Sequence, residues 1–172
     1  MSKKFISPES FYSDSALLGK KIYDSKFRPD FILGVWRGGS VPALVIDEVF
    51  RYYGYRSDNI AIRTSRYTGI GQATEEVKVH SLDYLRSTLK PNQSILIVDD
   101  IFDSGKSLKA IKDAISNLRY SEIRIATVYY KSGNNTQDFE PNYYVRITND
   151  WVVFPHEFEG LNMEEKDHKP WF

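Results

Sequence analysis

The hydrophobic positions of this chain alternate between helical spacing and short continuous runs, which predicts helices that alternate with buried strands. From Pro8 onwards, apolar residues recur at roughly helical spacing up to Ile22, and Ser7 is a suitable N-cap for this helix. By contrast, Phe31–Trp36 is a short apolar run bounded by turn residues, which is typical of a buried strand. The pattern therefore opens with a helix followed by a strand.

The rest of the chain continues this alternation. It predicts helices at 41–53, 82–89 and 107–118, and strands at 59–64, 94–98, 123–130, 143–147 and 151–154. The strand at 94–98 is apolar on both faces, as a central parallel strand should be. Residues 66–76 are polar and without periodicity, which favours a long exposed loop, and 161–172 is expected to be a solvated tail. We therefore expect an α/β fold with a mostly parallel sheet flanked by helices and ligand chemistry at the carboxyl edge.

Composition narrows the function classes. The 172 residues, 41% of them hydrophobic, are enough for one globular domain spanning 1–172. The 23 basic and 23 acidic residues cancel, so we expect no nucleic acid and no membrane surface as a partner. The lack of cysteine excludes disulfides, thiol nucleophiles and Cys-ligated zinc, and it favours a reducing, cytoplasmic location. Any affinity for phosphate must come from a local site.

Residues 95–108 contain the most informative chemistry in the sequence. A buried strand ends in Asp99 and Asp100, whose carboxylates suit ribose hydroxyls and a hard divalent cation. The start of a helix follows, and its unpaired N–H groups favour a phosphate monoester. Hydroxyl groups and a close approach are offered there by Ser104, Gly105 and Ser107. A ribose 5-phosphate would fit this segment, although the residues alone also allow a polar strand-to-helix turn with a capping aspartate.

The same segment resembles the signature of the type I phosphoribosyltransferases. That signature is four apolar residues, two acids, two spacers, and then Asp-Thr/Ser-Gly-Lys/Gly-Thr/Ser, which is matched here with serine at Ser104 and Ser107. The resemblance implies that Asp103 is the catalytic acid–base residue. It also implies a set of residues that bind phosphoribosyl pyrophosphate, namely Arg37, Gly38, Asp99, Asp100, Asp103, Ser104, Gly105, Lys106 and Ser107.

The segment Gly34–Gly39 resembles the pyrophosphate loop of this family, in which a basic residue precedes paired glycines after the first core strand. Arg37 offers a bidentate fork for phosphate oxygens, and the resemblance gives it a catalytic role beside Asp103. It also implies a cis peptide bond between Trp36 and Arg37. Taken alone, Arg-Gly-Gly is more typical of a simple turn.

Residues 65–76 lie where the family keeps a mobile catalytic loop that is marked by a Ser-Tyr pair. The chain has Ser65-Arg66-Tyr67 instead, one residue longer, so either Ser65 or Tyr67 can take the family role. A plain solvated loop is the alternative interpretation.

Lys131 and the segment Asp150–Glu157 resemble the base-binding hood of the 6-oxopurine branch of the family. The resemblance implies that Trp151 stacks on the purine, that the backbone of Val152 reads one edge of the base, and that Lys131 donates to the oxygen at C6. It further implies Mg²⁺ held by Asp99, Asp100 and Glu157. His156 stands where the branch usually has a second tryptophan. Without the resemblance, Trp151 would be interpreted as a core residue and Lys131 as a surface lysine.

The resemblance as a whole implies a purine phosphoribosyltransferase of purine salvage. Its core would span about 31–130, and its hood would combine the N-terminal segment with about 131–160. Its substrates would be phosphoribosyl pyrophosphate and hypoxanthine, guanine or xanthine. It would form a homodimer or homotetramer. A regulatory protein of the same fold that binds phosphoribosyl pyrophosphate is one alternative, and a pyrimidine phosphoribosyltransferase is another. The zero net charge and the short segment before the first core strand argue against a DNA-binding regulator. The segment Trp151–Glu157 argues against a pyrimidine enzyme.

Overall fold

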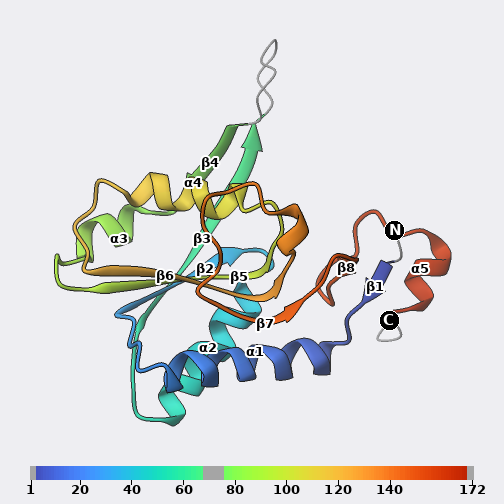
Figure 1. Cartoon of the computed structure of the whole chain (residues 1–172), viewed down its shortest axis with the longest axis horizontal. Helices are drawn as coiled ribbons and strands as arrows, with labels where there is room; N and C mark the ends of the chain where they lie inside the picture. The colour runs from blue at the N-terminus through green and yellow to red at the C-terminus, as the bar shows by residue number, and fades with distance from the viewer. Residues whose placement is uncertain (1–2, 68–75, 170–172) are drawn as a thin grey trace.

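The computed structural model describes residues 3–67 and 76–169, and a six-stranded sheet forms its centre (Figure 1). The strands lie in the spatial order β4 (Glu76–His80), β3 (Asp58–Tyr67), β2 (Phe31–Trp36), β5 (Ser94–Phe102), β6 (Glu122–Tyr130) and β7 (Tyr143–Ile147). Only the β3–β4 pair is antiparallel, and every other neighbouring pair in this sheet is parallel. The α/β fold with a mostly parallel sheet is therefore confirmed.

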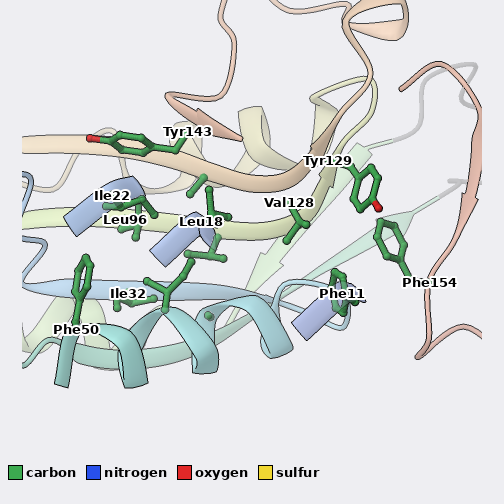
Figure 2. Packing of buried hydrophobic residues seen from close by; sticks show 14 of the residues in the cluster. Phe11, Leu18, Ile22, Ile32, Phe50, Leu96, Val128, Tyr129, Tyr143 and Phe154 are labelled. Atoms are coloured by element: carbon green, nitrogen blue, oxygen red, sulfur yellow. The ribbon is translucent and has the colours of Figure 1, made fainter. Parts of the chain in front are cut away.

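Helices cover both faces of this sheet (Figure 1), because successive strand residues point to opposite sides. One face packs on α1 (Pro8–Asp24) and α2 (Ser40–Tyr52), and the other packs on α3 (Asp83–Thr88) and α4 (Lys106–Ile115). Figure 2 shows the first of these two cores, in which Ile32 and Leu96 of the sheet face Leu18 of α1. None of the helices in the described ranges has the length and apolar character needed to span a membrane.

The expected start of α1 is confirmed, because the Ser7 side chain accepts a hydrogen bond from the backbone N–H of Ser10 at 3.1 Å. The strand expected at 94–98 runs further than its apolar residues suggest and continues to Phe102. This extension arises because backbone pairing with β6 persists past Val98, through Asp99 and up to Phe102. The two acidic residues therefore lie within β5.

A second, two-stranded sheet joins the two ends of the chain. β1 (Lys3–Phe5) pairs in parallel with β8 (Trp151–Val153), and α5 (Met163–Asp167) lies beside this pair (Figure 1). Residues 163–167 of the expected solvated tail form a helix with no buried residue, Lys169 is buried, and 170–172 lie outside the described residues. A capping box between Asn162 and Glu165 begins the helix. Glu165 then pairs with Lys3 at 2.5 Å and His168 stacks on Phe5, so contacts with the N-terminal strand order the segment.

The loop expected at 66–76 is wrong at both of its ends. β3 continues to Tyr67 and β4 begins at Glu76, and these two residues are paired in the antiparallel register. The alternation of Val77 and Val79 with polar neighbours is the pattern of a half-buried edge strand, and it was the available signal for β4. Residues 68–75, the centre of the expected loop, lie outside the described residues.

The turn between β2 and α2 lies directly against the main sheet. A Cβ atom added at Gly39 would lie 2.2 Å from the carbonyl oxygen of Val98 and 2.8 Å from the backbone nitrogen of Val35. Both neighbours are backbone atoms of central strands, so neither has freedom to move away. Glycine is therefore required at 39 for steric reasons.

We predict that Gly39→Ala lowers the free energy of unfolding by about 2–3 kcal/mol, because the methyl group overpacks a site built from strand backbone. Urea denaturation followed by circular dichroism measures this change. Gly133→Ala is the matched control, since its Cβ would meet only the side-chain oxygen of Asn149 at 3.1 Å, and we expect a change within about 0.5 kcal/mol. Equal stability of the two variants would contradict the assigned crowding.

Candidate active site

Three neighbouring parallel strands deliver the predicted site residues to one edge of the sheet. β2 ends at Trp36 and is followed by Arg37, β5 contains the two acids, and β6 ends at Tyr130 and is followed by Lys131. Because β2, β5 and β6 are adjacent and parallel, their carboxyl ends lie side by side. The sequence order of the motifs thus becomes a spatial cluster.

The loop after β2 has the conformation expected from the resemblance. The peptide bond between Trp36 and Arg37 is cis, and the Arg37 side chain is exposed to solvent. Gly38 lies against the neighbouring strand, since a Cβ atom there would be 2.1 Å from Oδ2 of Asp100. The absence of a side chain at 38 thus leaves the space that the Asp100 carboxylate occupies.

The two acids of β5 interact with each other. The backbone N–H of Asp100 donates to Oδ1 of Asp99 at 3.0 Å. Burial raises the pKa of the Asp99 carboxyl well above its ordinary value, and the charge of Asp100 raises it further. Two adjacent carboxyl groups, one of which is costly to ionise beside the other, form a suitable donor set for a hard divalent cation.

Glu157 makes a hydrogen bond within its own turn. Its Oε2 accepts the backbone N–H of Phe154 at 2.9 Å, within its own turn. Among the residues that the structure describes, no group of three or more His, Asp or Glu side chains is arranged to hold a metal ion. That Glu157 helps to hold Mg²⁺ beside Asp99 and Asp100 stays a prediction.

The turn from β5 into α4 is fixed by its backbone conformation and by the segment that follows β6. Gly105 has a φ of +75°, and a Cβ atom there would lie 2.6 Å from the Phe102 ring. The carbonyl oxygen of Ser104 accepts hydrogen bonds from Oγ1 of Thr136 at 3.0 Å and Nε2 of Gln137 at 3.1 Å. The first turn of α4, which starts at Lys106 and includes Ser107, presents backbone N–H donors at this edge.

A second cluster forms where the base is expected. Nζ of Lys131 lies 3.4 Å from Oδ2 of Asp103 and 5.7 Å from the centre of the Trp151 ring. Lys131 is 6% exposed whereas Trp151 is 56% exposed. Without the family resemblance, Lys131 would have been expected at the surface and Trp151 in the core. Asn134, in the short 3₁₀ helix η1 (Ser132–Asn134), donates to Oδ1 of Asp103 at 2.9 Å. The sequence analysis missed Asn134, because an Asn in a polar turn has no distinguishing pattern.

A pocket of about 300 Å³ lies between the loop after β2 and the segment from 151 to 161, with Arg37, Trp151 and Glu157 among its lining residues. Val152 lies next to Trp151 in β8, and its side chain is buried in the core that packs on α1. That the backbone of Val152 reads one edge of the base stays a prediction.

The mobile-loop residues lie on β3 rather than in a loop. Oγ of Ser65 lies 2.8 Å from Nε2 of His80 on the paired strand β4. Arg66 and Tyr67 form the end of β3, and the part of the expected loop that follows is outside the described residues. Which of Ser65 and Tyr67 takes the family role stays a prediction.

Known proteins resemble this chain over nearly its whole length. The model of the phosphoribosyl transferase domain matches residues 9–161. A hypoxanthine-guanine phosphoribosyltransferase of Lactococcus lactis is 31% identical over 171 residues, which cover 96% of this chain and 85% of that protein. A xanthine-guanine phosphoribosyltransferase of Cereibacter sphaeroides is 30% identical over 127 residues, which cover 72% of this chain and 66% of that protein.

The fold has solved counterparts as well. The crystal structure of a purine phosphoribosyltransferase from Pyrococcus horikoshii superposes with a TM-score of 0.72 at 26% identity, covering 94% of this chain and 99% of that one. The shared domain, the length of the alignments and the agreement in fold lead to one conclusion. The chain belongs to the phosphoribosyltransferase family, and its resemblance within that family is to the purine enzymes.

Proposed function

We propose that this protein transfers the 5-phosphoribosyl group of phosphoribosyl pyrophosphate to a 6-oxopurine, forming a nucleoside 5′-monophosphate and releasing pyrophosphate. The observation that carries this proposal is the contact of Lys131 with both Asp103 and Trp151 beside the phosphate-binding turn. A cation, a carboxylate and an aromatic face together match the oxygen, the ring N–H and the flat surface of a 6-oxopurine. The purine relatives agree with this assignment.

The sugar phosphate and the leaving group would be held by the other residues at the sheet edge. The 5-phosphate would bind the N–H groups and hydroxyls of the turn at 103–107, and the ribose hydroxyls would bind the carboxylates of Asp99 and Asp100. Arg37 would bind the pyrophosphate with its guanidinium group. Mg²⁺ fits beside Asp99 and Asp100, and when bound it would offset the negative charge that develops on the leaving pyrophosphate.

Asp103 would handle the proton of the purine. The bond that breaks joins the anomeric carbon to pyrophosphate, and the bond that forms joins this carbon to a ring nitrogen of the base. As the base becomes cationic, the carboxylate of Asp103 would accept its proton or a hydrogen bond from the imidazole N–H. The contacts of Asp103 with Lys131 and Asn134 hold the carboxylate in position for this step.

The identity of the preferred 6-oxopurine, the homodimer or homotetramer and the cytoplasmic location expected from the sequence stay predictions. Measuring nucleotide formation from hypoxanthine, guanine, xanthine and adenine with phosphoribosyl pyrophosphate and Mg²⁺ tests the proposed function directly. A lack of nucleotide with every base, accompanied by tight binding of phosphoribosyl pyrophosphate, would instead support the regulatory alternative.

We predict that Asp103→Asn lowers kcat by about 10² or more, because an amide cannot accept the proton of the base. Binding of phosphoribosyl pyrophosphate, measured by calorimetry without a base, should change by no more than a few-fold. Asp113→Asn, an exposed position on helix α4 that follows the turn, removes an equal charge and is the control. A parallel loss of binding and turnover would show that Asp103 mainly caps the turn.

We predict that Lys131→Ala reduces the preference for hypoxanthine over adenine, measured as the ratio of the two kcat/KM values. The ammonium group donates to an oxygen at C6 but faces another donor in adenine, so the wild-type ratio should be about 10² or more. Lys109→Ala, a surface change on α4, should leave the ratio unaltered. Adenine as the best wild-type substrate, or an unchanged ratio in Lys131→Ala, would contradict this role.

We predict that Asp99→Asn stabilises the free protein at pH 7.5 while weakening its binding of Mg²⁺ and phosphoribosyl pyrophosphate. The folded-state pKa of Asp99 is raised, so the group stabilises the fold only where it is protonated, and this contribution is lost as pH rises above about 4 through the folded-state pKa. The gain in melting temperature from Asp99→Asn should therefore increase between about pH 4 and pH 8.

Thermal melts across this pH range, with Asp113→Asn as a charge-matched control, measure the effect. A melting temperature that falls in Asp99→Asn at pH 7.5 would show that the neighbouring N–H donors stabilise the carboxylate more than burial and Asp100 destabilise it.

A further inference from the structure

His156 connects the hood to the ribose-binding carboxylates. Its Nε2 lies 3.2 Å from Oδ2 of Asp100, and the two side chains are 25% and 11% exposed. Its ring is nearly parallel to that of Phe154, with 5.5 Å between the ring centres and an interplanar angle of 9°, and it also contacts the Phe11 ring. These contacts orient the imidazole edge towards the carboxylate.

The hydrogen-bonding pattern of the imidazole indicates which nitrogen carries the proton. Nδ1 is buried and has no hydrogen-bond partner within the part of the chain that the structure describes. An unpaired buried N–H group would be costly, so the proton belongs on Nε2, where the Asp100 oxygen can accept it. The distance of 3.2 Å between Nε2 and Oδ2 is short enough for Asp100 to accept this proton's contact.

Asp100 is also enclosed on its other side. The carboxylate fills the space above Gly38, where a Cβ atom would lie 2.1 Å from Oδ2. Both carboxylate oxygens border this space, since Oδ1 would lie 2.6 Å from the same Cβ atom, so the carboxylate packed between Gly38 and His156 has little freedom to rotate. The orientation of Asp100 thus depends on a residue of the hood.

The turn that carries His156 is itself held by the C-terminal segment. Nζ of Lys169 donates to the carbonyl oxygens of Phe154 at 2.6 Å and Pro155 at 3.3 Å, and also to that of Glu157. Lys169 is 4% exposed, and burial lowers the pKa of its ammonium group. Three carbonyls that converge on one buried cation fix the backbone of the turn on both sides of His156.

We infer that His156 is a positioning residue for the binding of phosphoribosyl pyrophosphate, acting through its Nε2–H hydrogen bond to Asp100. This inference rests on the proposed role of Asp100 in holding the ribose. It assigns a task to the residue that replaces tryptophan in this branch of the family. It also gives the turn at 154–157 a second task. This turn follows β8, which carries the proposed base-stacking residue Trp151, and it would also orient the carboxylate of Asp100.

The test compares His156→Phe, which keeps the ring stack but lacks the donor, with His156→Gln, which keeps an N–H group at a similar position. For His156→Phe we expect the Kd of Mg²⁺–phosphoribosyl pyrophosphate and the KM for this substrate to rise about 10-fold or more, the usual effect of a lost hydrogen bond to a charged group. The KM for hypoxanthine should stay within about 2-fold, and His156→Gln should recover most of the affinity.

A double-mutant cycle with Asp100→Asn identifies the partner. If the hydrogen bond carries the effect, His156→Phe should cause little further loss of affinity in the Asp100→Asn background. Should His156→Phe fail to fold, Lys169→Met provides the same measurement, because it releases the turn and should raise the same Kd without changing the KM for hypoxanthine.

Wild-type affinity in His156→Phe, or equal losses in the Phe and Gln variants, would overturn the inference and leave His156 as a packing residue. These results are distinguishable from a failure of the proposed function. If Asp100→Asn alone binds phosphoribosyl pyrophosphate as tightly as wild type, the assignment of the ribose site fails, whereas weak binding in Asp100→Asn with normal binding in His156→Phe removes only the role of His156.

Discussion

The close approach between the turn after β2 and the carboxyl end of β5 is the constraint on which the rest of the site depends. Gly39 lies against the backbone of Val98, and Gly38 leaves only enough space for the carboxylate of Asp100. The loop proposed to bind pyrophosphate and the strand proposed to bind ribose are thereby held at a fixed separation. The protein achieves this with backbone packing, which is less adjustable than contacts between side chains.

At the same close approach, two carboxyl groups lie side by side, which costs the free protein stability. Asp99 is crowded against Asp100 in one partly buried place, where burial and the charge of Asp100 disfavour the charged form of Asp99. Such an arrangement works against the stability of the free protein and favours a ligand that brings positive charge and hydroxyl groups. The neighbouring base site is built differently, because Asp103 there is matched with Lys131 and Asn134 and its carboxylate is partnered before the ligand arrives.

The sequence predicts the features that depend on local patterns. The apolar strands, the helix caps and the acidic turn at 99–107 are continuous in the chain, so spacing alone identifies them, and the cis bond before Arg37 follows from the family resemblance. The features that were missed depend on contacts between distant residues. β1 has only three residues, two of them lysines, and it forms because β8 offers a partner. Lys169 and Asn134 gain their roles from carbonyls and a carboxylate that the sequence places far away.

The pairing of β1 with β8 has a consequence for synthesis of the protein on the ribosome. Residues 3–5 have no strand partner until residues 151–153 have been made, whereas β2, β3, β5 and β6 are all complete by Tyr130. The sugar-phosphate half of the site can therefore assemble while the hood is still being translated. Closing the β1–β8 sheet is a contact of very long sequence separation, and such contacts tend to form late. The growing chain thus completes the proposed sugar-phosphate site before it completes the proposed base site.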